Sequence, residues 1–299
     1  MDISHLTYKG TPLCWNSATL ETSPIYYEER GVEWLRTFFG GILTTCGLTY
    51  AGHPCKDEGK ELGLHGRISN LPANNVNTEE YWKNDDYFIE VTGSVREASV
   101  FGDKLELRRK IHMKMGEDKI FIEDSIKNIG FGKSPYMIIY HINIGFPILD
   151  KYSELIEPES KITPYDESSR EGIDYYSTFD VPIKGYKENV FLHDIKADSE
   201  GQVNVAIINE KFEDKGIGVY LKYNKNNLRY LNEWKMMGQG EYVVGIEPVN
   251  CQVCGRAKLR EEGTLRFLDP DEVVKNSLEI GILKSNKQIN EYREYINKI

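Results

Sequence analysis

Residues 104–128 read KLELRRKIHMKMGEDKIFIEDSIKN, and this stretch carries the clearest structural signal in the chain. Apolar residues stand at alternate positions before Gly116-Glu117-Asp118, where Arg109 is the one break in that register, and Ile120, Ile122 and Ile126 resume the alternation after it. Alternation with a period of two places one face of a strand against a core and the other face in water. A polar triplet that begins with glycine is typical of a turn. The stretch therefore predicts two successive strands of a half-buried sheet.

The same character recurs along most of the chain. Strand-like runs cover residues 87–95, 136–144, 203–208, 217–223, 242–246 and 278–283. Helical spacing is rare, and its best case is the C-terminal tail, at Ile289, Tyr292 and Ile296. Residues 151–186 are rich in Glu, Ser, Pro and Tyr, and we expect long loops there. Many short strands with turns about every 8–12 residues predict a sandwich or barrel rather than a parallel α/β sheet.

The composition restricts the class of protein. No Pro/Gly/Ser-rich linker divides the 299 residues, so we expect one domain over residues 1–299. A net charge of −10 without a basic stripe argues against a nucleic-acid partner. No run reaches the roughly 18 apolar residues of a membrane span, so no membrane partner is expected. Five cysteines, an odd number, fit a reducing compartment such as the cytoplasm. Cys251 and Cys254 resemble half of a zinc site that no second pair completes, so no metal is expected.

A loop with an ionisable residue on each side of a glycine is the first candidate site. It reads LHGRISNLPA over residues 64–73, where His65 and Arg67 flank Gly66. Glycine permits a close approach of the backbone to a ligand, and arginine offers a planar fork of donors. Loops carry both binding sites and surface ion pairs. Arg67 is therefore expected either to contact a ligand or to pair with a surface carboxylate.

Two apolar strands carry isolated polar residues. His141 and Asn143 stand two residues apart, on one face of the run YMIIYHINIG, and Glu247 directly follows the run YVVGI. Glutamate is almost never fully buried unless it is paired. We interpret His141 and Glu247 as candidate site residues. The alternatives are a buried histidine that is simply hydrogen-bonded and a carboxylate at a strand end in solvent. For His193, we expect a local hydrogen bond to Asp194 or to the backbone.

Three further residues could contact a ligand. The rings of Trp34 and Trp234 could stack on a sugar, although packing in the core would explain both equally well. Arg36 could reach the same ligand if its segment is a strand, and a surface ion pair is the alternative.

Three segments, HGRISNLPA (residues 65–73), YHINIGFP (140–147) and GIEPVN (245–250), resemble in this order motifs of the aldose 1-epimerase (galactose mutarotase) superfamily. Longer stretches resemble an uncharacterised bacterial branch of it: WLRTFFGGILTTCGL (34–48), EWKMMGQGEYVVGIEP (233–248) and NCQVCGRAKLREEG (250–263). The resemblance covers nearly the whole chain. It implies an all-β fold, an antiparallel β-sandwich of the supersandwich type with few short helices. It also implies that a sugar binds on a concave face of a sheet.

The resemblance further implies an isomerase that interconverts the anomers of an aldose and needs no cofactor. His141 corresponds to the general acid that acts on the ring oxygen, and Glu247 to the general base that acts on the anomeric hydroxyl. His65 corresponds to a residue that contacts the substrate. Arg67 stands where the family usually has a second glycine. Arg67, Asn143, Trp234 and Arg36 complete the expected set of substrate contacts.

Three alternatives remain open at this point. Arg67 could select an acidic or phosphorylated sugar for an isomerisation or epimerisation elsewhere on the ring. A divalent metal ion could be held by His65, His141 and Glu247. The protein could also bind a carbohydrate without catalysis. The expected partner in each case is a small sugar, and exposed sheet edges would allow a homodimer.

Overall fold

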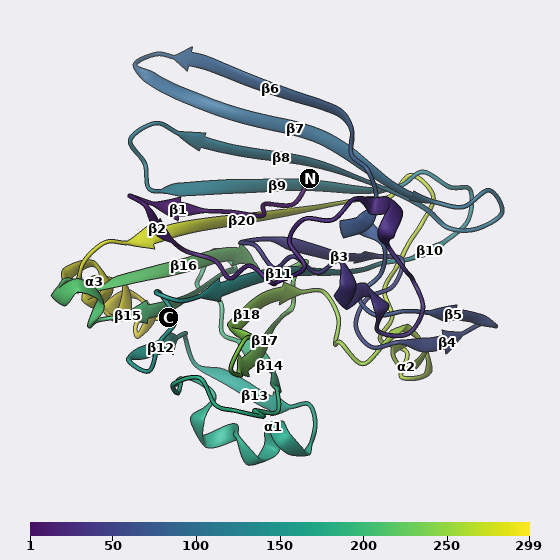
Figure 1. Ribbon diagram of the computed structural model, residues 1–299. Coiled ribbons are helices and arrows are strands. Elements are labelled where there is room, and N and C mark those ends of the chain that lie inside the picture. The colour runs from purple at the N-terminus through teal and green to yellow at the C-terminus, as the bar shows by residue number, and fades with distance from the viewer.

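Two large antiparallel sheets form the molecule, and the computed structural model describes all residues from 1 to 299 (Figure 1). In spatial order, the eight-stranded sheet consists of β12 (Ser153–Ile156), β15 (Gln202–Asn209), β16 (Ile217–Asn224), β20 (Val273–Leu283), β9 (Lys119–Asn128), β8 (Lys104–Lys114), β7 (Asp86–Ala98) and β6 (Asn74–Lys83). The six-stranded sheet consists of β13 (Ser160–Pro164), β14 (Asn189–Ile195), β17 (Tyr230–Met237), β18 (Tyr242–Val249), β11 (Met137–Gly145) and β3 (Thr44–Leu48).

Short elements connect and cover these sheets. Three two-stranded ribbons are β1 (Thr7–Tyr8) with β2 (Thr11–Pro12), β4 (Cys55–Asp57) with β5 (Lys60–Leu62), and β10 (Ser134–Pro135) with β19 (Phe267–Leu268). The α-helices are α1 (Glu167–Glu171), α2 (Arg256–Glu261) and α3 (Asn286–Ile296). Five 3-10 turns are η1 (Pro24–Tyr26), η2 (Glu33–Arg36), η3 (Ile68–Asn70), η4 (Ile173–Tyr175) and η5 (Phe212–Asp214). None of the helices has the length and apolar character that a membrane span requires.

The predicted all-β antiparallel sandwich with few short helices is confirmed. Each strand-like run of the sequence lies in a strand of one of the two sheets, except Tyr136, which directly precedes β11. The expected C-terminal helix is α3, whose Ser285 side chain caps the N-terminus by accepting from the Gln288 N–H, while Ile289 and Ile296 are buried. The prediction of long loops over residues 151–186 is partly wrong, because β12, β13 and α1 lie there.

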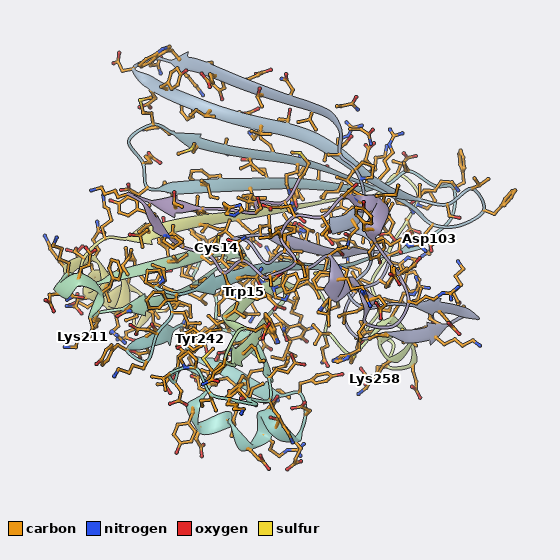
Figure 2. All side chains as sticks on the ribbon, viewed as in Figure 1. Cys14, Trp15, Asp103, Lys211, Tyr242 and Lys258 are labelled. Atoms are coloured by element: carbon orange, nitrogen blue, oxygen red, sulfur yellow. The ribbon has the colours of Figure 1, made fainter.

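Side chains fill the space between the two sheets (Figure 2). The principal core is a cluster of 38 buried apolar residues, to which β8 contributes Leu105 and Leu107. From β11 the same cluster receives Ile138, Tyr140 and Ile142. Since side chains alternate along a strand, the residues between them point to the opposite face of the six-stranded sheet.

Arg109, the break in the alternation of β8, lies on the core face. Its guanidinium binds both carboxylate oxygens of Asp124, at 2.8 and 2.7 Å, and also contacts Asp2 at 3.0 Å. The Tyr140 hydroxyl donates to the same Asp124 carboxylate at 2.8 Å. A buried charge is tolerated when such partners satisfy it, so the strand keeps its register despite an arginine in the core.

The expected local hydrogen bond of His193 is wrong. Its Nδ1 lies 3.0 Å from both oxygens of Glu157, and its Nε2 lies 3.2 Å from Glu233. The ring is fully buried, and Asp194 instead accepts from Lys225. Strand pairing accounts for part of this arrangement, since His193 on β14 is opposite Leu231, two residues before Glu233 on β17. The histidine therefore connects β14 to Glu157 and Glu233, which are distant from it in sequence.

Candidate active site

His141 and Glu247 lie side by side on the face of the six-stranded sheet that points away from the principal core. Strand β11 is antiparallel to β18, with Ile142 opposite Ile246, so the register brings the next residue pair together. Nε2 of His141 lies 3.0 Å from Oε1 of Glu247, and both side chains are almost completely buried. Both candidates therefore stand within the sheet, and Glu247 is not at an exposed strand end.

Glu247 has one oxygen held and one oxygen free. The Asn232 amide on β17 donates to Oε2 at 2.7 Å. Oε1 has no hydrogen-bond donor, because its contact with His141 lacks hydrogen-bond alignment, and Nδ1 of His141 is also without a partner. A buried acceptor without a donor is costly and is rare in folded proteins. This carboxylate oxygen is therefore available to accept a proton from a bound molecule.

Gly245 makes room for the pair. It lies two residues before Glu247 on the same face of β18. A Cβ atom at this position would stand 2.5 Å from Oε1 of Glu247 and 3.0 Å from Cε1 of His141. Any side chain at residue 245 would push the two functional groups out of place. The sequence motif GIEP contains this glycine, but only the strand geometry explains it.

His65 approaches from the loop that precedes η3. Its backbone has a φ of 57°, in the left-handed region, and is fixed by hydrogen bonds from its N–H to Gly52 and from Gly47 to its carbonyl. The ring meets His141 edge-on, with 6.0 Å between centroids. Burial, with the imidazoles of His141 and His53 nearby, lowers the pKa of His65 well below its usual value. His65 is therefore a neutral imidazole at neutral pH, and its buried Nδ1 has no partner.

These groups line a pocket of about 180 Å³ with aromatic walls. Phe38 stacks on Trp34 at 4.6 Å and lies 5.0 Å from the His141 ring. Trp234 meets His141 edge-on at 5.5 Å and donates its indole N–H to Glu188 at the rim. Apolar walls with a few convergent polar groups are the usual composition of a small-molecule site.

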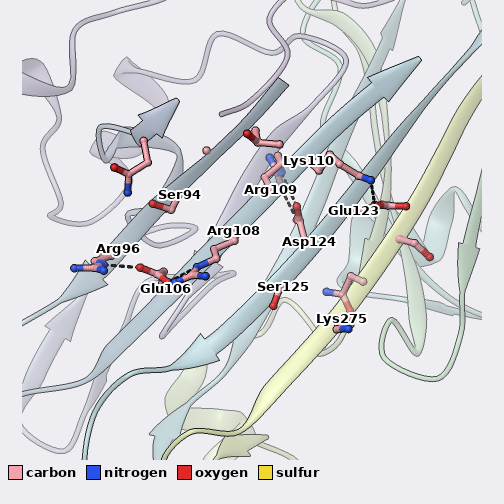
Figure 3. Close-up of a pocket in the computed structure, with 15 residues that line it drawn as sticks. Ser94, Arg96, Glu106, Arg108, Arg109, Lys110, Glu123, Asp124, Ser125 and Lys275 are labelled. Atoms are coloured by element: carbon pink, nitrogen blue, oxygen red, sulfur yellow. Dashed lines mark hydrogen bonds and ion pairs between the residues drawn. The ribbon is translucent and has the colours of Figure 1, made fainter. Parts of the chain in front are cut away.

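A larger hollow of about 830 Å³ lies on the outer face of the eight-stranded sheet (Figure 3). Its fifteen lining residues include no hydrophobic side chain. Arg96 and Arg108 both bind Glu106, and Lys110 pairs with Glu123 at 2.7 Å. With no aromatic wall and with most of its charges paired, this hollow has the character of a solvated sheet face. The smaller pocket is therefore the candidate active site.

Three expected substrate contacts lie outside the candidate pocket. Arg67 is bound through two hydrogen bonds of 2.7 Å to Glu29, which also accepts from Tyr50. Arg36 belongs to the 3-10 turn η2 rather than to a strand, and it pairs with Glu33 in solvent. Asn143 is fully buried, and its amide donates to the backbone carbonyls of Gly41 and His141. Each of these side chains is occupied by a partner from the protein itself.

The remaining expected residues line the pocket together with residues that the sequence did not suggest. His65, His141, Glu247, Trp34 and Trp234 all belong to the lining. Sequence reasoning missed four polar or aromatic members, which are Phe38, His53, Glu188 and Asn232. Nowhere in the structure do three or more His, Cys, Asp or Glu side chains form a group that could hold a metal ion.

The sequence matches the family described as a domain of unknown function, DUF4432, over residues 1–282. The chain belongs to this family. None of the curated proteins matches the sequence.

Several solved structures are similar to this chain. A proposed aldose 1-epimerase from Klebsiella pneumoniae is 25% identical, with a TM-score of 0.92 over 99% of this chain and 77% of that one. A galactose mutarotase related enzyme from Lactobacillus acidophilus has a TM-score of 0.59 and 13% identity, over 83% and 84% of the two chains. A galactose mutarotase-like protein from Lactobacillus casei has a TM-score of 0.58 and 11% identity, over 94% of each chain. The resemblance to the aldose 1-epimerase superfamily is thus confirmed at the level of the fold.

Proposed function

We propose that this protein is an aldose 1-epimerase-type isomerase in which Glu247 and His141 act as base and acid. The observation that carries the proposal is the contact between the two side chains at 3.0 Å, with one free carboxylate oxygen, on the floor of an aromatic pocket. Ring opening requires one proton to leave the C1 hydroxyl and another to reach the ring oxygen. Both of these oxygens are bonded to C1, so a pair of groups in contact matches their proximity.

The reaction proceeds by two balanced proton transfers. Oε1 of Glu247 accepts the proton of the C1 hydroxyl while Nε2–H of His141 donates to the ring oxygen, and the C1–O5 bond breaks to give the open aldehyde. Rotation about C1–C2 turns the other face of the carbonyl towards the C5 hydroxyl. Reversed transfers then close the ring, with His141 as base and Glu247 as acid. Each group of this kind contributes about 10²–10⁴-fold in rate.

Other groups around the pair would bind the sugar rather than move protons. Nδ1 of a neutral His65 has no partner in the protein, so it can donate a hydrogen bond to a sugar hydroxyl or accept one from it. The aromatic rings offer apolar faces and exclude water, which strengthens electrostatic interactions inside the pocket. No arginine or lysine lines the pocket. We therefore propose a neutral aldose as substrate rather than an acidic or phosphorylated one.

Anomeric exchange measured by NMR tests the proposed function. Freshly dissolved pure anomers of neutral aldoses such as glucose and galactose would be compared with glucuronate and glucose 6-phosphate. We expect catalytic amounts of protein to accelerate exchange for at least one neutral aldose and not for the acidic ones. Binding without acceleration would instead identify a non-catalytic carbohydrate-binding protein.

A further inference from the structure

A second hollow of about 170 Å³ lies against the candidate active site. Two of its nine lining residues, Asn232 and Val253, also line the first pocket. The volumes of the two hollows, 170 and 180 Å³, are nearly equal. The proposed function makes no use of this second space.

Strand register places the second hollow on the same row of the sheet as the catalytic pair. Glu247 on β18 is opposite Asn232 on β17, which is opposite Leu192 on β14, which is opposite Thr163 on β13. Leu192 and Thr163 line the second hollow. Neighbouring strands are about 4.8 Å apart, so the row extends roughly 14 Å from the base to the edge of the sheet. The two hollows therefore follow one another along one line on one face.

A stacked pair of rings links the linings of the two hollows. His53 lines the first pocket and Tyr165 lines the second. Their rings are parallel within 9°, with centroids 4.9 Å apart. The backbone N–H of His53 donates to the carbonyl of Val253 at 2.8 Å, and the backbone N–H of Tyr165 donates to the carbonyl of Val190 at 2.9 Å. These bonds fix the backbone of both residues, and Tyr165 is still 42% exposed.

The lining of the second hollow combines an aromatic ring with exposed hydrogen-bonding groups. Tyr165, Leu192 and Val253 offer apolar surface. Thr163 and Gln252 also line the hollow and are exposed, so the hydroxyl and the amide can bind a ligand's hydroxyl groups. A sugar ring presents both an apolar face and a circle of hydroxyls, and such a lining matches both.

We infer that the second hollow is a subsite for a second sugar ring, so that the preferred substrate is a reducing disaccharide. Its reducing ring would occupy the pocket of His141 and Glu247, and the attached ring would pack on Tyr165. The inference rests on the proposed function for the orientation of the disaccharide, because only the reducing ring has an anomeric hydroxyl for Glu247. Two hollows of similar volume along one row correspond to two linked rings of similar size.

An anionic substituent is the competing occupant, because Lys258 also lines the second hollow. This lysine projects from α2 at the periphery of the molecule (Figure 2). Its side chain is 60% exposed and its nearest acidic partner is Glu262, at 3.9 Å. A single exposed ammonium gives little affinity for a phosphate or carboxylate, since solvent screens it. The aromatic ring and the exposed amide favour the neutral second ring.

The test compares reducing disaccharides with their component hexoses. Maltose, cellobiose, lactose and melibiose would be assayed for anomeric exchange beside glucose and galactose, with wild type, Tyr165→Ala and Tyr165→Phe. For at least one disaccharide, we expect wild type to have a higher kcat/KM than for its reducing hexose. The ratio of kcat/KM for the disaccharide to kcat/KM for the hexose should fall about tenfold in Tyr165→Ala. Tyr165→Phe keeps the ring and should preserve this ratio.

Several results would overturn the inference. One is a wild-type preference for free hexoses over every disaccharide. Another is a ratio of disaccharide to hexose kcat/KM that Tyr165→Ala leaves unchanged. A preference for glucose 6-phosphate that disappears in Lys258→Gln would assign the hollow to an anion instead. Equilibrium binding of the same sugars, followed by tryptophan fluorescence, separates this inference from the proposed function. If no sugar exchanges faster but a disaccharide binds more tightly through Tyr165, the subsite stands and the proposed reaction fails.

Discussion

The Asn232 amide donates a 2.7 Å hydrogen bond to Oε2 of Glu247, and both side chains are buried. The two residues are directly opposite each other on β17 and β18. This contact fixes the orientation of the carboxylate and leaves Oε1 without a hydrogen-bond donor. Asn232 is thus a positioning residue for the proposed base.

Replacing Asn232 should change the pH dependence as well as the rate. Asn232→Leu removes a hydrogen bond to a charged group, worth about 1.5–3 kcal/mol, and we expect kcat to fall roughly 10- to 100-fold. Asn232→Asp places a second carboxylate beside Glu247 and should raise the pKa of the base, which moves the acidic limb of the kcat/KM profile to higher pH. Profiles from pH 4 to 9 would check both variants. An acidic limb that stays in place in Asn232→Asp would contradict the positioning role.

Gly245→Ala should strongly reduce activity without unfolding the protein. The added Cβ would stand 2.5 Å from Oε1 of Glu247, a distance that real Cβ contacts do not adopt, so the carboxylate must move. We expect a loss of at least about 100-fold in kcat/KM, because small misplacements of reacting groups have effects of this size. Gly132→Ala is the matched control, since no atom lies within 4 Å of a Cβ there. Equal activity of the two variants would show that the pair tolerates the displacement.

Arg67→Gln should affect stability rather than substrate binding. The Arg67 guanidinium is bound at two points to Glu29, and both side chains are only partly buried. We expect a loss of about 1 kcal/mol in the free energy of unfolding after allowance for solvent screening, with KM unchanged within twofold. Arg67→Lys should restore only part of the stability, because an ammonium cannot make the same fork. A large rise in KM in Arg67→Gln would contradict this structural role and indicate that Arg67 contacts the substrate.

His193 should make the stability of the protein pH-dependent at alkaline pH. Burial alone would lower its pKa, but hydrogen bonds with Glu157 and Glu233 outweigh burial and raise the pKa of His193 to about 9. The unfolded value is about 6.5, so the stabilisation is complete below that pH and is lost as pH rises towards 9. We expect Tm to fall over this range. His193→Gln should flatten that dependence, whereas the exposed His5→Gln should not. Equal slopes in wild type and His193→Gln would contradict this account.

Much of the fold could be predicted from the sequence, because strand alternation is a local property. The strands β8 and β9 follow directly from the pattern of Leu105, Leu107 and Ile122. Strand β6 could not be found this way, because all ten of its residues are exposed at the edge of the sheet and no apolar alternation is required. The prediction of one domain over residues 1–299 stays a prediction.

The candidate site was only partly predictable, because its geometry depends on contacts between distant segments. His141 and Glu247 could be singled out as polar residues in apolar strands. The partner of Arg67 is Glu29, 38 residues away in the sequence, and no local pattern predicts that ion pair. Strand register brings Asn232 into the pocket, and the path of the loop that follows η2 brings Phe38 there. Both are tertiary properties. Asn232 can be assigned to the pocket only once β17 is paired with β18.

The exchange rate of a pure sugar anomer with wild type and with Glu247→Gln is the most direct test of the central claim. Glutamine preserves the volume and the contact with Asn232 but cannot accept the proton of the C1 hydroxyl. We predict accelerated exchange with wild type and a loss of about 10²–10⁴-fold in kcat with Glu247→Gln, while Tm remains close to that of wild type. Wild-type rates in Glu247→Gln would contradict the account.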